Sequence, residues 1–294
     1  MVRRQHPRPP LLFLVAVPLL VLARCATDPA RQNRVSPESV VSLPPNRWPE
    51  QKKAAHALSR LAFGSSPEDQ REIGALGIEG WINRQLHPGQ VPDVLLADKL
   101  RAFPILTRSP EELEDEYPLP QARVKILGLD PGSPEALALI EAIPKEELPR
   151  QIDVQMLGAK MVRAVESRRQ LEEVLTDFWF NHFNVSMDKG PVRWMATSYE
   201  RDAIRPHIFG YFRELLAATA HHPAMLFYLD NWLSVRDRTP GERRRLQNDP
   251  KRNGAAPPGL NENYARELLE LHTLGVNGGY MQKDVRETAR AFTG

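Results

Sequence analysis

The sequence has one cysteine, Cys25, and no long hydrophobic run. A single cysteine cannot form an internal disulfide, so an oxidising compartment would add no covalent cross-link. The longest apolar run, residues 11–23, is too short to cross a bilayer, which takes about 20 residues. Apolar residues make up 41% and charged residues 26% of the chain, which is typical of a globular protein.

Several catalytic and binding motifs are also missing. No Gly-x-Ser-x-Gly, His-Glu-x-x-His, Walker or Gly-x-Gly-x-x-Gly motif occurs, which argues against common hydrolases, zinc proteases, nucleoside triphosphatases and dinucleotide-binding enzymes. The longest basic stretch, residues 234–259, has no aromatic side chain for base stacking, and its prolines and glycines indicate a solvated loop. We therefore expect no nucleic-acid binding.

Signals for β-strands are scarce, whereas signals for helix starts recur. No segment alternates cleanly between apolar and polar residues, and the 27 prolines disfavour a large central sheet. Ser66, Ser109 and Ser133 each precede Pro-Glu, the pattern of an N-cap followed by proline at the first helical position. We predict an all-α fold, an irregular multi-helix bundle. Three of its later helices are expected at 206–220, 262–274 and 283–292.

Residues 1–25 have the form of a secretory signal peptide, with a basic start, the apolar run and Cys25 at the end. Cys25 occupies the position at which a bacterial lipoprotein is lipidated, but Arg24 stands where the lipobox has a small residue. Ordinary cleavage after Cys25, with no lipid, is the alternative. In both cases we expect an exported protein of the periplasm or outer envelope, and in the first case a lipid anchors it to the membrane.

The rest of the chain divides by composition into three parts. Residues 26–49 are rich in Pro, Ser, Asn and Arg without an apolar period, which predicts a disordered, flexible tether. Residues 50–165 are expected to form an N-terminal helical region. Residues 166–294 are expected to form a helical core region that includes the basic loop 234–259.

The first candidate for chemistry is His182, in the aromatic-rich segment 177–184. At about 100° per residue it falls on the same helix face as Leu171 and Leu175, the face expected to be buried. A buried imidazole needs a partner. His182 is therefore either a core histidine bonded to a backbone carbonyl, or a metal ligand or acid/base group oriented by neighbours such as Asn181.

The second candidate is Glu267, in the helix expected at 262–274. On a regular α-helix Glu267 and Glu270 share a face while His272 points away, so these three residues do not form a metal site. Glu270 fits an exposed i,i+4 ion-pair ladder. Glu267 lies at the edge of the apolar face, and we predict that it is inside, paired with His182 as the catalytic groups.

Asp230 and Asn263 complete the candidate site as orienting groups. Asp230 follows a short helix expected to start at Pro223, where it suits either the rim of a binding site or a plain C-terminal turn. The adjacent His221 and His222 point to different sides of the helix end and do not make a two-histidine metal site. A divalent metal in the site is left open, and its identity is unknown.

Five blocks of sequence, in this order, resemble a known bacterial family, domain of unknown function 1800. They are residues 54–64, 177–184, 221–231, 261–275 and 284–294, and the Asn-Glu-Asn-Tyr-Ala-Arg-Glu segment that starts at residue 261 is specific. The resemblance implies an exported, mostly helical protein, often encoded beside a second uncharacterised family that resembles sulfatases. It assigns no activity and no catalytic residues to this chain. The family continues past the last block, so we expect its C-terminal part to be missing and the apolar stripe of the last helix to lack a partner.

Two functions are compatible with these features. In the first, His182 and Glu267 form an acid/base site, with or without a metal, in an exported enzyme. In the second, the same groups are a buried polar network in a non-catalytic envelope scaffold or partner-binding lipoprotein. One cluster open to solvent would favour the enzyme, and a closed cluster or wide separation would favour the scaffold.

Overall fold

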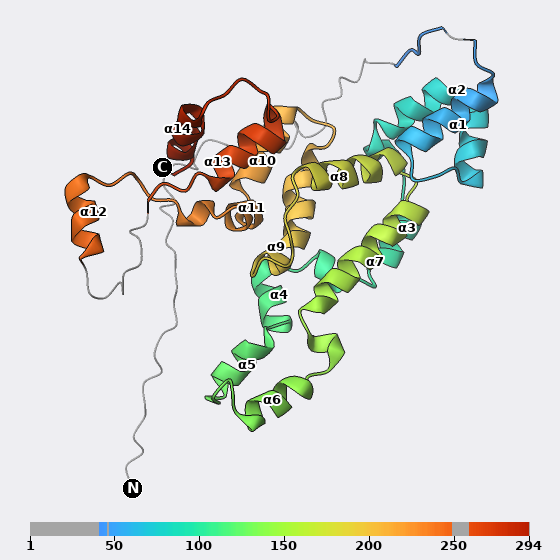
Figure 1. Cartoon of the computed structure of the whole chain (residues 1–294). Helices are drawn as coiled ribbons and strands as arrows, with labels where there is room; N and C mark the ends of the chain where they lie inside the picture. Colours follow the sequence, from blue (N-terminus) through green and yellow to red (C-terminus); the bar gives the residue numbers. More distant parts are fainter. Residues whose placement is uncertain (1–40, 46, 249–258, 294) are drawn as a thin grey trace. The chain divides into compact units, whose positions relative to one another are not determined.

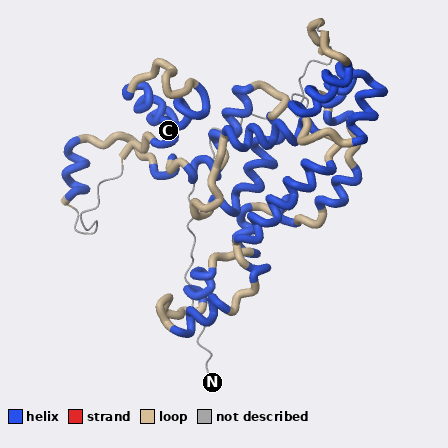
Figure 2. The backbone as a smooth tube through the Cα atoms, turned by 45° about the vertical axis from the view of Figure 1, so that its right-hand side comes forward, coloured by secondary structure: helices blue, strands red, loops and turns tan. Residues whose placement is uncertain are grey.

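The computed structural model describes residues 41–45, 47–248 and 259–293. Cys25, the leader, residues 26–40 of the tether and residues 249–258 of the basic segment lie outside this part of the chain. Its described residues form helices, turns and loops without a β-strand, which confirms the all-α prediction (Figure 2). No helix among these residues has the length and apolarity to span a membrane.

The helices follow one another along the chain (Figure 1). The first six are α1 (Glu50–Leu61), α2 (Pro67–Gln85), α3 (Val94–Leu100), α4 (Pro110–Glu116), α5 (Pro120–Ile126) and α6 (Pro134–Glu141). The others are α7 (Arg150–Glu166), α8 (Gln170–His182), α9 (Val192–Ser198), α10 (Phe212–His221), α11 (Pro223–Tyr228), α12 (Pro240–Gln247), α13 (Asn263–Glu267) and α14 (Gln282–Thr293). Two π-helices, η5 (Tyr199–Ile204) and η9 (Leu268–Thr273), directly continue α9 and α13. Short 3-10 turns are η2 (Pro88–Gln90), η3 (Pro104–Leu106), η4 (Lys145–Glu147), η6 (Arg205–His207) and η7 (Asn231–Leu233).

The predicted serine caps are present. The side chains of Ser66, Ser109 and Ser133 each accept a hydrogen bond from the backbone N–H three residues later. The following proline is the first residue of α2, α4 and α6 in turn. These helix starts are therefore set by local sequence, as the pattern predicts.

Two predictions about the second half of the chain need correction. Pro206 does not start a helix, because it lies inside the turn η6, and α10 begins only at Phe212. The segment 234–259 is not all loop, because Thr239 and Glu242 form a capping box that starts α12. Its prolines and glycines suggested a loop, although Thr-Pro-Gly-Glu is a start signal of the same kind as the serine caps.

Among the described residues, buried apolar side chains form three clusters. The largest joins α4 and α7 to α8, α9, α10, α11 and α13, and includes Phe183 and Tyr199. The second packs α1 on α2 around Trp81. In the third, α13 packs on α14. The first cluster includes Phe180 and Phe183, which flank His182 in the sequence.

The apolar stripe of α14 is covered within this chain. Val285 and Ala289 are buried and cluster with Ala265 of α13. Phe292 contacts the ring of Tyr264 edge-on, with the two ring centroids 5.1 Å apart. The expectation that this stripe would lack a partner is therefore wrong.

Candidate functional site

His182, the last residue of α8, is half-buried and bonded to a distant part of the chain. Its Nε2 lies 3.1 Å from the backbone carbonyl oxygen of His272. Because a carbonyl only accepts, the imidazole donates from Nε2, which leaves Nδ1 as an acceptor in the neutral ring. The ring also contacts Phe178, Trp179 and Phe183, at centroid distances of 6.4, 5.4 and 4.7 Å. His182 thus joins the end of α8 to η9.

The π-helix η9 explains how His272 reaches His182. In η9 the backbone hydrogen bonds reach back five residues instead of four, which widens the turn. Residues four apart then stay on one face, so Tyr264, Leu268 and His272 align. Tyr264 and His272 are buried, whereas Leu271 is 59% exposed. The segment therefore turns His272, and not Leu271, toward the core beside Tyr264.

The His272 side chain sits among aromatic rings. Its centroid is 5.3 Å from that of Phe183 and 6.4 Å from those of Tyr264 and His182. Burial, and then the nearby charge of His182, lower the pKa of His272 to about 4. The ring is therefore neutral at physiological pH.

Glu267 lies on the same helical segment as His272 but is not joined to His182. Burial raises the pKa of Glu267, and the charge of Glu270 adds to this, while Arg266 opposes it. The carboxylate is half-buried. Within the described residues no hydrogen bond or ion pair connects it to His182. The structure places His272, not Glu267, against His182.

Among the described residues, none of the three predicted orienting residues has a hydrogen bond or ion pair with the His182 ring. Asn181 is exposed and bonds within its own helix. Asp230 has a left-handed backbone, with φ of 59°, and pairs with Lys189 at 2.8 Å. Asn263 donates to the carbonyl of Leu229, the residue before Asp230 in the chain, at 3.2 Å. In the part of the chain that the structure describes, no group of three or more His, Cys, Asp or Glu residues could hold a metal ion.

Ser198 and His222 lie close enough to suggest a nucleophile and its base, but their hydrogen bonds do not fit these roles. The Ser198 hydroxyl donates to the carbonyl of Met195 at 2.8 Å, and its oxygen is 3.5 Å from His222 Nε2. His222 Nδ1 accepts from the Ala224 N–H at 3.2 Å, so the neutral ring carries its proton on Nε2. A protonated Nε2 cannot remove the proton of Ser198.

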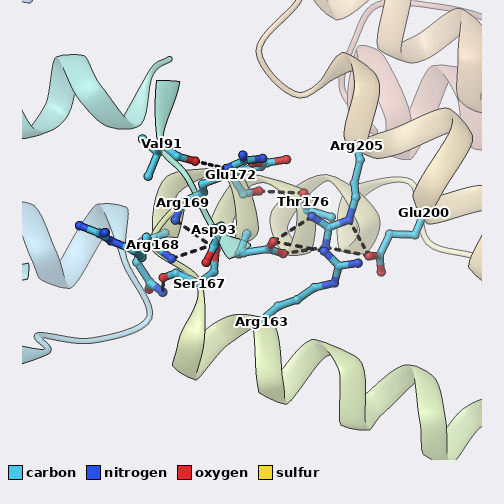
Figure 3. Close-up of polar contacts among 12 residues, drawn as sticks. Val91, Asp93, Arg163, Ser167, Arg168, Arg169, Glu172, Thr176, Glu200 and Arg205 are labelled. Atoms are coloured by element: carbon cyan, nitrogen blue, oxygen red, sulfur yellow. Dashed lines mark hydrogen bonds and ion pairs between the residues drawn. The ribbon is translucent and has the colours of Figure 1, made fainter. Parts of the chain in front are cut away.

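A buried ionic cluster, which sequence reasoning missed, lies where α7, α8 and η5 meet (Figure 3). Arg205 donates to the two carboxylate oxygens of Glu173 at 3.0 and 2.6 Å, and to Oε1 of Glu200 at 3.0 Å. Arg163 Nη1 lies 3.5 Å from Glu173. The Glu173 and Glu200 side chains are only 6% and 9% exposed. Two arginines therefore balance two carboxylates in the interior.

The turn between α7 and α8 is held by polar side chains. Buried Gln170 accepts from the Phe63 N–H at 3.0 Å and donates to the Ser167 carbonyl at 2.7 Å. Asp93 accepts from the Ser167 hydroxyl at 2.8 Å and from the Arg168 N–H at 3.0 Å (Figure 3). These bonds fix Phe63 and the α7–α8 turn relative to one another.

A groove of about 980 Å³ runs between this turn, α7 and the start of α2, and we call it the α7 groove. Its apolar lining includes Phe63, Leu157, Met161 and Val165, which are 48, 62, 58 and 71% exposed. Its charged lining has five carboxylates and three cationic side chains: Glu68, Asp69, Glu72, Glu166, Asp177, Arg71, Lys160 and Arg168. The groove combines an apolar wall with a mainly acidic rim.

Comparison with known proteins identifies the family alone. A family model with the description "Protein of unknown function (DUF1800)" matches residues 56–294. No curated protein and no solved structure matches the chain. The matched region contains His182, the ionic cluster and the α7 groove, and it overlaps all five blocks of sequence that resembled this family. The chain belongs to the DUF1800 family.

Proposed function

We propose that this protein is an exported, envelope-tethered scaffold that binds a helix of a partner protein in the α7 groove. The observation that supports this is the apolar face of α7, which stays exposed beside a turn fixed by polar contacts. Covering a large apolar side chain is worth about 1.5–3 kcal/mol. A row of such side chains on one helix marks an interaction surface.

The spacing of this face suits a helical partner. Val154, Leu157, Met161 and Ala164 are alternately three and four residues apart, the a/d spacing of a seam that packs against another helix. Val154, Leu157 and Met161 are more than half exposed. The seam spans about 15 Å along α7, so two to three turns of an amphipathic helix would cover it.

The charges around the groove favour a basic partner. Carboxylates outnumber cationic side chains in its lining, and Glu68 and Glu166 are 58% and 41% exposed. Electrostatic complementarity then selects a helix with lysine or arginine beside its apolar seam. The proposed occupant is such a helix from another protein.

The acid/base hypothesis has less support. The Nε2 of His182 is occupied by the His272 carbonyl, and among the described residues Glu267 makes no hydrogen bond or ion pair with the ring. A bond of this kind, which fastens one helix end to another, is what the scaffold hypothesis expects.

Binding by the groove can be tested with two model peptides of about 15 residues, with the same apolar seam and either lysine or glutamate flanks. We expect the full chain to bind the lysine peptide, and Met161→Glu to weaken binding by at least about tenfold, since it places a charge in the seam. Leu137→Glu is the matched control, because Leu137 is 58% exposed on α6 and outside the groove. Isothermal titration calorimetry measures the affinity of the wild type, Met161→Glu and Leu137→Glu for each peptide.

Failure to bind either peptide, or equal binding by Met161→Glu, would contradict the proposal. Preference for the glutamate peptide would contradict the basic partner. A wild-type dimer that Met161→Glu dissociates would show that the occupant is a second copy of this chain and not a partner.

The tether is a separate part of the proposal, supported by the leader sequence. We expect the mature chain to begin at a lipid-modified Cys25, and Cys25→Ser to move the protein from the membrane fraction to the soluble fraction. Mass spectrometry of the mature N-terminus is the measurement. A chain that begins at Ala26 without lipid would exclude the anchor.

A further inference from the structure

We propose that a second groove, formed by α1, α2 and the segment that precedes α1, binds a long-chain fatty acid. We call it the α1–α2 groove, and its volume is about 460 Å³. Pockets for small molecules have volumes of roughly 300–1,000 Å³. The α1–α2 groove shares no lining residue with the α7 groove, so the inference does not depend on the proposed function.

Contacts within the chain hold all three walls of this groove in place. The segment before α1 is fixed to α2 at two points. Asn83 Oδ1 accepts from the Val41 N–H at 2.9 Å, and further along the segment Glu79 accepts from the Leu43 N–H at 2.7 Å. The two helices lie side by side and pack around buried Trp81 (Figure 1). A groove that is already formed costs less entropy when a ligand binds.

The lining of the α1–α2 groove is mostly apolar. Its apolar residues include Leu43, Trp48, Leu61, Ile78 and Ile82. Sugars and nucleotides lose their bound water in a pocket and need several hydrogen-bond partners in exchange, which such a lining does not provide. An acyl chain needs none, and each methylene that leaves water is worth about 0.8 kcal/mol. The lining therefore favours an acyl chain.

The titratable groups of the lining are all basic. They are Lys53, His56 and Arg60, and the lining contains no carboxylate. Lys53 pairs with Glu50, whose side chain is 77% exposed, and a pair so exposed contributes little. Arg60 is exposed and has no ion pair among the described residues, so its guanidinium is available to a carboxylate of the ligand. One apolar chain with one anionic group, as in a fatty acid, matches this combination.

Oleate below its micelle concentration is the probe, and isothermal titration calorimetry with the full chain measures its affinity. We expect Arg60→Glu to weaken oleate binding by about fivefold to tenfold, because it removes a cation and places a second carboxylate beside that of the ligand. Arg245→Glu is the matched control, because it makes the same change of charge at an exposed position of α12 outside both grooves. The control should keep the affinity of the wild type.

Tryptophan fluorescence locates the bound chain. Trp48 lines the groove and is 43% exposed, and bromine quenches the fluorescence of a tryptophan that it contacts. Brominated stearate should therefore quench the wild type, and Trp48→Phe should lose most of this quenching. Trp232→Phe is the control, because Trp232 is 56% exposed and outside the groove, and this variant should keep the quenching.

Three results would overturn the proposal. The first is the absence of oleate binding, or equal affinity of Arg60→Glu and Arg245→Glu for oleate. The second is equal quenching in Trp48→Phe and Trp232→Phe, which would place the fatty acid elsewhere on the chain. The third is binding to phosphatidylglycerol vesicles without binding of free oleate, which would identify a membrane surface as the occupant.

Discussion

Replacing Arg205 by methionine is expected to lower the free energy of unfolding by about 3–5 kcal/mol. Arg205 is the shared partner of Glu173 and Glu200, whose side chains are buried, and its own side chain is only 15% exposed. Without it, two carboxylates remain in the interior with only the 3.5 Å contact from Arg163. Desolvated charges without a partner cost far more than the methionine gains in packing. Urea denaturation of the full chain measures the difference.

Arg123→Met is the control for this prediction. Arg123 makes a 2.8 Å ion pair with Glu147, which is 50% exposed, so its loss should cost less than about 1 kcal/mol. Arg205→Lys should lose an amount of unfolding free energy between those of the two methionine variants. An ammonium keeps the charge, but it lacks the planar guanidinium that binds both carboxylates. If Arg205→Met costs no more than Arg123→Met, the cluster does not stabilise this fold.

The helix starts could be predicted from sequence because their causes are local. Ser66, Ser109 and Ser133 each accept a hydrogen bond from a backbone N–H three residues later, so donor and acceptor are close together in the sequence. The bond between Phe63 and Gln170, in contrast, joins residues 107 positions apart. The apolar periodicity of one segment does not indicate which distant segment will pack against it. The α7 groove depends on such long-range bonds, so the sequence did not reveal it.

The ionic cluster left a partial signal. Glu173 is three residues from Thr176 and seven from Phe180, so a helical wheel places all three on one face, and all three are buried. That pattern could have identified Glu173 as a buried carboxylate that requires a cationic partner. Its partner Arg205 could not be found in this way, because it lies in a turn that follows a π-helix.

The prediction for His182 had two parts, its place in the helix and its partner. The wheel correctly put His182 toward the interior, where it meets a backbone carbonyl, one of the two alternatives that the sequence left open. The choice of Glu267 as its partner assumed a regular helix through residue 274. The π-helix η9 changes the angular position of every later residue, and it brings His272 inward instead. The pairing of His182 with Glu267 as catalytic groups therefore stays a prediction without structural support.

The stability of the fold is expected to fall steeply between about pH 6.5 and 4 because of two histidines. Burial, as the main cause, lowers the pKa of His222 and of His272 to about 4 in the folded chain. In the unfolded chain a histidine has a pKa of about 6.5. Between these values the unfolded state binds more protons than the folded state, so protons favour unfolding as the pH falls. Below about pH 4 both states are protonated and these two residues cause no further loss.

His272→Phe isolates one of these contributions. The variant keeps an aromatic ring beside Phe183, and the bond from His182 survives because it goes to the backbone carbonyl of residue 272. Relative to wild type, its loss of unfolding free energy from pH 7 to pH 4.5 should be smaller by about 2–3 kcal/mol. His221→Gln is the control, because His221 is exposed and should leave the wild-type loss unchanged. The measurement is urea denaturation of the three proteins at both pH values. Carboxylates also titrate near pH 4, but their contribution to the free energy of unfolding is the same in variant and wild type and cancels in the difference between them. If His272→Phe and wild type lose stability in parallel, His272 is not held neutral by the fold, and its burial against Phe183 cannot be the cause of acid sensitivity.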